Sequence, residues 1–460
     1  MQPTVLRIAL PAARATALRW VSGIVFEEML GLSIEVSETP ASDVVLSAFG
    51  RRLVMRSVFP GLDKPISPLR AQIPLLPLTL LDAERVPEVG ADEPLPILFG
   101  SPSLSRVGHD LDCGFDVLGS VFFMLSRFEE VALSERDTHD RFSATASLAW
   151  RGGFLYRPIV DEYVEVLWAL MKRLWPGLPR KRRQGQVNVS CDVDQPFDNV
   201  GKDPIMLARV VRYELIKKRR PNMAARRMMN YVAHQFGSHR FDPFHTFGWY
   251  MDVCERHNRR AAFYFIADHS HETMDGTYEI DDPRILSLMH DIARRGHEIG
   301  MHGSYNTYRD GPQLMRERQR LERACEMASV RRVPSGNRQH YLRWDTAKTP
   351  DLLDAAGFEY DTTGSFADRP GFRYGTSHSF PMWSWQTQAP LRILQKPLVV
   401  MEGSIISQQY LGLGHSREAR NLMQTLKDRS LRYGGDFNIL WHNSEFFDPE
   451  DRELFEQMLK

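Results

Sequence analysis

The feature that most constrains the fold is a regular alternation, from about residue 187 onward, between short apolar runs and amphipathic stretches. The runs have the length of buried strands, and the amphipathic stretches have the spacing of helices. The strand-like runs are 187–190, 261–267, 298–301, a short one at 332–333, 358–360, 398–401 and 438–441. The helical stretches are 247–257, 282–295, 313–329, 347–356 and 416–433. Repeated strand–helix units predict an α/β fold with a parallel sheet, and about seven of them favour a distorted (β/α)7 barrel over an open doubly wound sheet.

A segment rich in Pro, Gly and Arg at 175–183 has the composition of a linker between domains. The helical stretches before it are 12–32, 116–131 and 160–174, and the strand-like ones are 44–48 and 52–56. We therefore expect a smaller α/β domain of unknown role at 1–180 and the barrel at 184–460.

The bulk composition excludes several classes of protein. Lys+Arg and Asp+Glu both number 58 in the 460 residues, so no overall charge favours nucleic acid. The four cysteines are scattered without a CxxC pair, which favours a reducing compartment. No secretory h-region or membrane-spanning run is present, and no Gly-rich nucleotide-binding motif follows a strand. These features predict a cytoplasmic protein of enzyme size.

Two carboxylates, Asp192 and Asp194, close the first strand-like run. Positions i and i+2 of an extended chain point to the same side, so both can face one pocket. Two such carboxylates repel each other unless a cation or a shared proton lies between them. A solvated turn is the alternative interpretation of the pair alone.

Polar residues also follow each of the later strand-like runs. In order, they are Asp268, His302 with Asn306, Arg338, Asp361, Glu402 and His442. The carboxyl ends of barrel strands build the active site in βα-barrels, so this recurrence predicts a shared site.

These residues resemble the motifs of the polysaccharide deacetylase family, the NodB-homology carbohydrate esterases. Asp192-Val-Asp194 matches the first motif of the family, in a form used by some lipid-linked sugar deformylases. Residues 296–306 are similar to the second motif. Residues 337–343 and 357–361 correspond more loosely to the third and fourth motifs, and residues 440–443 correspond to the fifth motif. The resemblance covers about 187–445 and implies a barrel of NodB type. Residues 1–180 resemble the uncharacterised domain that accompanies such domains in bacterial surface-polysaccharide gene products.

The resemblance implies a role for each matching residue. A divalent metal on Asp194 and His302 would activate water and polarise the carbonyl. Asp192 would be the general base, aimed by Arg338, and His442 would protonate the leaving amine. Asp361 would orient His442.

The sequence departs from the family at Asn306, which stands where the second metal-binding histidine is expected. An amide oxygen is a weaker donor than imidazole, so the site would favour a harder ion or recruit His340 or Tyr305. Zinc is the first choice of metal, with manganese, cobalt, nickel and magnesium as alternatives. Tyr305, His340 and Trp441 are also the expected substrate contacts.

The stretch 209–227 holds eight Lys and Arg residues against one acid, Glu214. Such a run is commonly a solvated face, and the alternative is contact with a phosphate-bearing substrate or an anionic membrane surface.

The leading hypothesis is a metal-dependent hydrolase that removes an N-linked acetyl group from an amino sugar in a surface-polysaccharide precursor, with a lipid-linked precursor as one candidate form. One rival is a deformylase or other amide hydrolase on the same barrel. The other is a catalytically silent carbohydrate-binding relative, which the departure at Asn306 favours.

Overall fold

The computed structural model describes residues 5–59, 69–89, 93–198, 203–236, 238, 240–332, 334–446 and 448–460. The chain forms two compact units. The first comprises 1–186, 342–399 and 426–437, and the second 187–341, 400–425 and 438–460. The first unit therefore includes two segments from later in the chain. The proposed division into domains at 1–180 and 184–460 stays a prediction. No helix of the described residues is long and apolar enough to cross a membrane.

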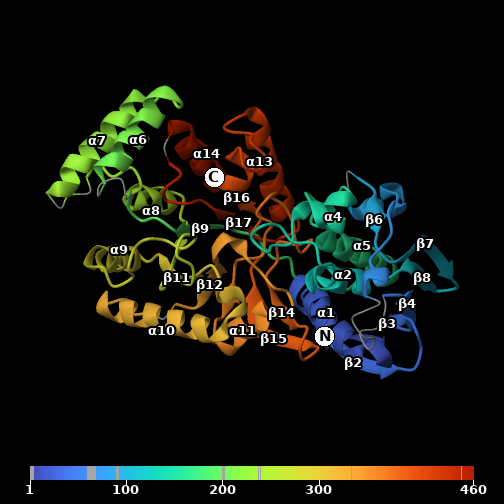
Figure 1. Ribbon diagram of the computed structural model, residues 1–460. Coiled ribbons are helices and arrows are strands. Elements are labelled where there is room, and N and C mark those ends of the chain that lie inside the picture. The colour runs from blue at the N-terminus through green and yellow to red at the C-terminus, as the bar shows by residue number, and fades with distance from the viewer. Residues whose placement is uncertain are drawn as a thin grey trace. The chain divides into compact units, whose positions relative to one another are not determined.

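The first unit contains a six-stranded mixed sheet in the order β2-β1-β3-β4-β8-β7 (Figure 1). Its strands are β1 (Leu6–Pro11), β2 (Ile34–Thr39), β3 (Val44–Ala48), β4 (Arg51–Met55), β7 (Gly100–Val107) and β8 (Asp110–Phe115). β5 (Thr79–Leu81) and β6 (Leu95–Ile97) form a separate pair. The early helices are α1 (Ala15–Ser22), α2 (Val117–Leu125), α3 (Phe128–Ala132), α4 (Leu148–Arg151) and α5 (Ile159–Leu174).

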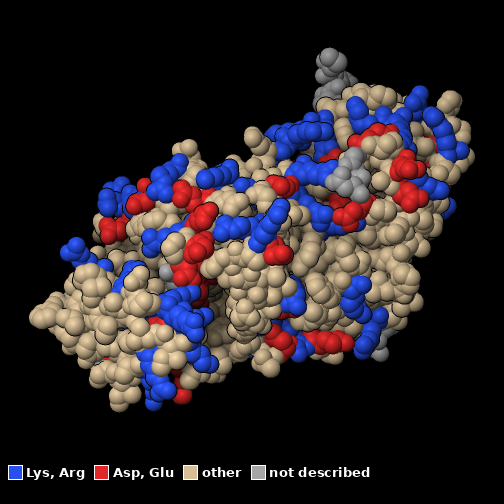
Figure 2. All heavy atoms as spheres, turned by 90° about the horizontal axis from the view of Figure 1, so that it is seen from above, with Lys and Arg blue, Asp and Glu red and all other residues tan. Residues whose placement is uncertain are grey.

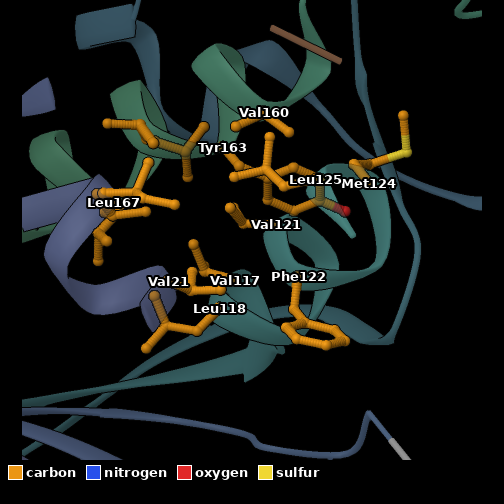
Figure 3. Close-up of a cluster of buried hydrophobic side chains, with 14 of the residues drawn as sticks. Val21, Val117, Leu118, Val121, Phe122, Met124, Leu125, Val160, Tyr163 and Leu167 are labelled. Carbon is orange, nitrogen blue, oxygen red and sulfur yellow. The ribbon is translucent and has the colours of Figure 1, made fainter. Parts of the chain in front are cut away.

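The core of this unit lies among α1, α2 and α5 (Figure 3). α2 is buried along its whole length, and Val121 points toward Val160 and Tyr163 of α5. Asp116 begins α2, because its Oδ1 accepts a hydrogen bond from Gly119 N at 2.7 Å. A side-chain cap of this kind satisfies a backbone donor that the helix itself leaves without a partner.

Later segments complete the same core. They form α11 (Thr349–Ala355), β13 (Tyr360–Asp361) and the β14–β15 hairpin (Phe380–Ser384, Ala389–Gln395). Trp383 of β14 packs against Trp20 of α1 at 5.1 Å between ring centroids, and Trp20 Nε1 donates to the carbonyl of Pro381 at 3.0 Å. The hairpin was not predicted from the sequence.

A buried ion network also joins the early and late segments of the first unit. Arg127 donates to Glu130 at 2.8 Å, and Arg373 donates to the same carboxylate at 2.8–2.9 Å. The side chains of all three residues are at most 3% exposed. Burial would raise the pKa of Glu130, but the guanidinium groups of Arg373 and Arg127 outweigh burial and lower it. Glu130 is therefore charged in the folded protein.

The second unit is built on parallel strands in the order β12-β11-β10-β9-β17-β16. They are β9 (Val187–Val193), β10 (Ala261–Phe265), β11 (Glu298–Gly303), β12 (Gly336–Gln339), β16 (Val400–Met401) and β17 (Phe437–Leu440). The helices are α6 (Pro204–Ile216), α7 (Pro221–Gln235), α8 (Phe247–Arg256), α9 (Pro283–Arg294), α10 (Gly311–Met327), α12 (Glu402–Ile406), α13 (Arg417–Arg432) and α14 (Pro449–Leu459). α13 extends into the part of the sequence assigned to the first unit.

The mixed α/β class is confirmed, but no closed (β/α)7 barrel is found among the described residues, since the strand order of the second unit has two ends. The strand expected at 332–333 lies slightly later, at Gly336–Gln339, and residue 333 is outside the described residues. The expected linker is not solvated throughout, because Trp175 and Leu178 are buried.

Candidate metal-dependent active site

Strands β9, β11 and β12 of the second unit end at the candidate site, with β10 between β9 and β11. Asp192 lies in β9 with Asp194 just beyond it, and His302 lies in β11. Arg338 lies in β12, in register with His302, and His340 follows two residues later. Parallel strands bring their carboxyl ends to one edge of a sheet, which is why residues distant in the sequence meet here.

Asp194, His302 and His340 form a group of possible metal ligands whose donor atoms all lie within 4.8 Å of one another. His302 Nε2 is 3.2 Å from Asp194 Oδ1, and His340 Nε2 is 3.7 Å from Asp194 Oδ2. Ligands at zinc-like bond lengths in a tetrahedron are separated by about 3.4 Å, so both distances suit one ion. Asp194 Oδ1 is buried and has no hydrogen-bond partner among the described residues, as expected of an atom that faces a cation. The residues present therefore fit a divalent metal.

The two imidazoles are held so that both Nε2 atoms face Asp194. His302 Nδ1 pairs with the carbonyl of Arg338 at 2.8 Å, and His340 Nδ1 pairs with Asp275 Oδ1 at 3.1 Å. Partners of this kind fix the tautomer of a metal-binding histidine and its ring orientation. Burial would raise the pKa of Asp194, but the two imidazoles outweigh burial and lower it well below the ordinary value. Asp194 is therefore charged in the folded protein.

Asp275 was not predicted from the sequence, and its loss is expected to weaken metal binding about 10–100-fold, the usual cost of losing a group that supports a ligand. Asp275→Asn removes the charge that orients His340 while keeping the size of the side chain. A metal titration at fixed pH measures the effect, with the exposed Asp281→Asn as the matched control. Equal metal affinity in both variants would contradict this role of Asp275.

Asp192 lies beside the metal-ligand group with a cation next to it. Arg338 Nη1 is 3.6 Å from Asp192 Oδ1, and Arg338 Nη2 donates to Ser190 Oγ at 2.8 Å. Asp192 Oδ2 is 3.7 Å from His302 Nε2. Arg338 is thus the cation beside Asp192, and its role in aiming Asp192 stays a prediction.

His442 faces the same site from the end of β17. Its Nε2 is 3.6 Å from Asp194 Oδ2, and its Nδ1 pairs with Glu402 Oε1. Burial would lower the pKa of His442, but the carboxylates of Glu402 and Asp194 outweigh burial and raise it well above the ordinary value. The carboxylate that orients His442 is thus Glu402.

The role assigned to Asp361 from the sequence is therefore corrected. Asp361 belongs to the first unit, where Oδ1 accepts from Thr363 Oγ1 at 2.7 Å and Oδ2 accepts from Thr363 N at 2.8 Å. Glu402 follows β16, which pairs with β17, so it stands next to the strand that carries His442. The position of Glu402 after a strand could be predicted from the sequence, but this strand order could not.

The other expected site residues are placed differently. The Asn306 side chain donates from Nδ2 to the carbonyl of Ser270 at 2.9 Å, and His340 is the third member of the metal-ligand group. Tyr305 is 8% exposed, and its ring contacts Tyr341 at 5.3 Å between centroids. Trp441 is fully buried and stacks on Phe446, so the expectation that it contacts substrate is wrong.

Comparison with known families gives one match, to a family model described as "Family of unknown function (DUF7033)", over residues 6–176. No curated protein matches the chain.

Three of these structures show the range of likeness. A protein from Mycobacterium smegmatis assigned as a polysaccharide deacetylase is 16% identical, with a TM-score of 0.39, over 61% of this chain and 84% of that one. A probable polysaccharide deacetylase from Pseudomonas aeruginosa PAO1 is 13% identical, with a TM-score of 0.38, over 68% and 90%. Puue allantoinase is 14% identical, with a TM-score of 0.37, over 62% and 85%. At these scores, none of them assigns an activity to this chain.

Proposed function

We propose that the second unit is a metal-dependent hydrolase that removes an N-linked acetyl group from an amino sugar. The observation that carries the proposal is the metal-ligand group of Asp194, His302 and His340 between two oriented acid–base groups, Asp192 and His442. The sugar in this proposal comes from the resemblance of the motifs to polysaccharide deacetylases.

A divalent ion in this site, with zinc as the first choice for a two-histidine, one-carboxylate set, supplies a more acidic water and a polarised acyl carbonyl. Asp194, His302 and His340 would hold it. Asp192, fixed by Arg338, takes the proton of the attacking water. His442 donates a proton from Nε2 to the leaving amine, while Glu402 holds Nδ1.

The substrate that we propose is an N-acylated precursor of a surface polysaccharide, in lipid-linked form, and the proposed compartment is the cytoplasm. All four cysteines are buried and free, which suits a reducing compartment. Removal of a formyl group is the closest alternative reaction, because the same groups would serve any small N-acyl amide.

The test combines metal analysis with a mass-spectrometric screen of N-acetylated and N-formylated amino sugars and their lipid-linked forms, with and without chelator. We expect about one metal ion per chain, in line with the one ligand group found among the described residues, and a deacylated product that chelation abolishes. His340→Ala is expected to lose the metal, whereas Asn306→Ala is expected to keep it.

Each alternative gives a different result. A protein that binds no metal and releases no acyl group, yet retains acylated sugars, would be the silent carbohydrate-binding relative. Loss of metal in Asn306→Ala but not in His340→Ala would restore Asn306 as the third ligand.

A further inference from the structure

We propose that α6 and α7, together the helical hairpin of residues 204–236, dock onto the surface of an anionic lipid bilayer. The two helices have 13 and 15 residues and run side by side (Figure 1). This inference is independent of the proposed chemistry.

The hairpin exposes an unusual amount of apolar surface. Of the 19 large apolar side chains that are exposed among the described residues, nine lie between Ile205 and Phe236. Phe236 is 83% exposed and Val232 57%. Met228, Val232 and Phe236 are spaced four residues apart, so they form one stripe along and just beyond α7. Exposed apolar surface concentrated in this way marks an interaction site.

Cations accompany this apolar surface. Arg209, Arg212, Lys217, Lys218 and Arg219 are all exposed. Glu214 is the one acid of residues 204–236, and it is buried, 3.6 Å from the guanidinium of Arg227. Seen from above, the region of the hairpin is largely tan, with groups of Lys and Arg and few acidic side chains (Figure 2). Its exposed charge is therefore positive.

The structure also removes part of the basic stretch from this surface. Arg227 is buried and pairs with Asp198 at 2.6 Å, and Arg220 pairs with Asp448. Arg226 donates to the carbonyl of Asp242 at 2.9 Å. These three arginines hold the hairpin against the rest of the second unit. The earlier basic residues and the apolar stripe therefore remain available to a partner.

An anionic bilayer surface is the partner that satisfies both features. Helices that lie at a membrane surface bury apolar side chains at the acyl boundary, while Lys and Arg meet headgroup phosphates. A second copy of the chain would satisfy the apolar side chains but would bring like charges together, which is unfavourable. Apolar side chains are not what binds a phosphate backbone in nucleic acid. Charge complementarity thus favours the lipid surface.

The experiment is co-sedimentation of the full chain with vesicles of phosphatidylcholine alone or mixed with phosphatidylglycerol. We expect sedimentation with the anionic vesicles only, weakened by salt because the attraction is screened. Lys217→Gln/Lys218→Gln/Arg219→Gln is expected to lower partitioning about 100-fold, since each basic residue near such a surface contributes roughly a five-fold factor. Met228→Ser/Val232→Ser/Phe236→Ser is expected to lower it as well, without removing any charge.

The matched control removes three exposed charges elsewhere in the second unit, by Arg323→Gln/Arg331→Gln/Arg332→Gln, and should bind vesicles like the wild type. Circular dichroism confirms that each variant is folded. Failure of the wild type to bind anionic vesicles would overturn the proposal. A dimer in analytical ultracentrifugation that the apolar variant dissociates, without vesicle binding, would assign the surface to a second copy instead.

Discussion

Replacing Asp192 by Asn is expected to lower turnover about 10²–10⁴-fold, the usual contribution of a positioned general base. The amide keeps the size of the side chain but cannot accept the proton of the attacking water. Asp194, His302 and His340 are unchanged, so the metal content should stay near that of the wild type. Steady-state kinetics on the deacylated product, together with metal analysis of the same sample, measure both quantities.

Asp268→Asn is the matched control, because Asp268 follows the neighbouring strand β10 and also pairs with an arginine, Arg320, at 2.7 Å. This variant should retain most of the turnover. Near-normal turnover in Asp192→Asn would remove Asp192 from the chemistry. Joint loss of metal and turnover would instead make Asp192 a metal ligand, given its 3.7 Å distance from His302 Nε2.

The second large effect concerns stability. Glu130→Gln is expected to lower the free energy of unfolding by about 3–5 kcal/mol, the cost of leaving a buried charge without its partner. Arg373 is 3% exposed and donates two hydrogen bonds to this carboxylate. Denaturant unfolding measures the change. Glu93→Gln is the control, since Glu93 is half exposed and its ion pairs should contribute at most about 1 kcal/mol.

Acid should reveal the same network. The folded pKa of Glu130 is lowered, so its stabilisation is fully present above the pKa of an unfolded glutamate. It is lost as the pH falls toward the folded pKa. The stability of Glu130→Gln should therefore change less with pH in the acid range. An equal acid dependence in variant and wild type would show that Glu130 contributes little.

Part of the site could be predicted because a spacing of two residues has a fixed meaning in a strand. Asp192 and Asp194 point to one side, and Arg338 and His340 repeat the same spacing three strands along the sheet. The pairs meet member by member, Arg338 with Asp192 and His340 with Asp194. The repeated spacing is the signal that could have identified His340, rather than Asn306, as the third member of the group.

The same periodicity explains the error at Trp441. Adjacent residues of an extended chain point to opposite sides, so a strand end that aims His442 at the site turns Trp441 away from it. The partner of His442 could not be predicted, because Glu402 becomes its neighbour only through the pairing of β16 with β17. Strand order depends on packing across the whole unit, and a single sequence does not encode it in any short pattern.

The late segment of the first unit has a consequence for modularity. The family model ends at residue 176, yet Trp383 packs on Trp20, and Thr376 Oγ1 donates to Asp161 at 2.6 Å. Residues 1–186 thus depend on a stretch that the chain supplies some two hundred positions later. A cut at the linker would separate 1–186 from 342–399, so both fragments would lose native contacts of the first unit. Recombination that moves the N-terminal half to another protein is therefore expected to keep the fold of the first unit only when it also carries 342–399.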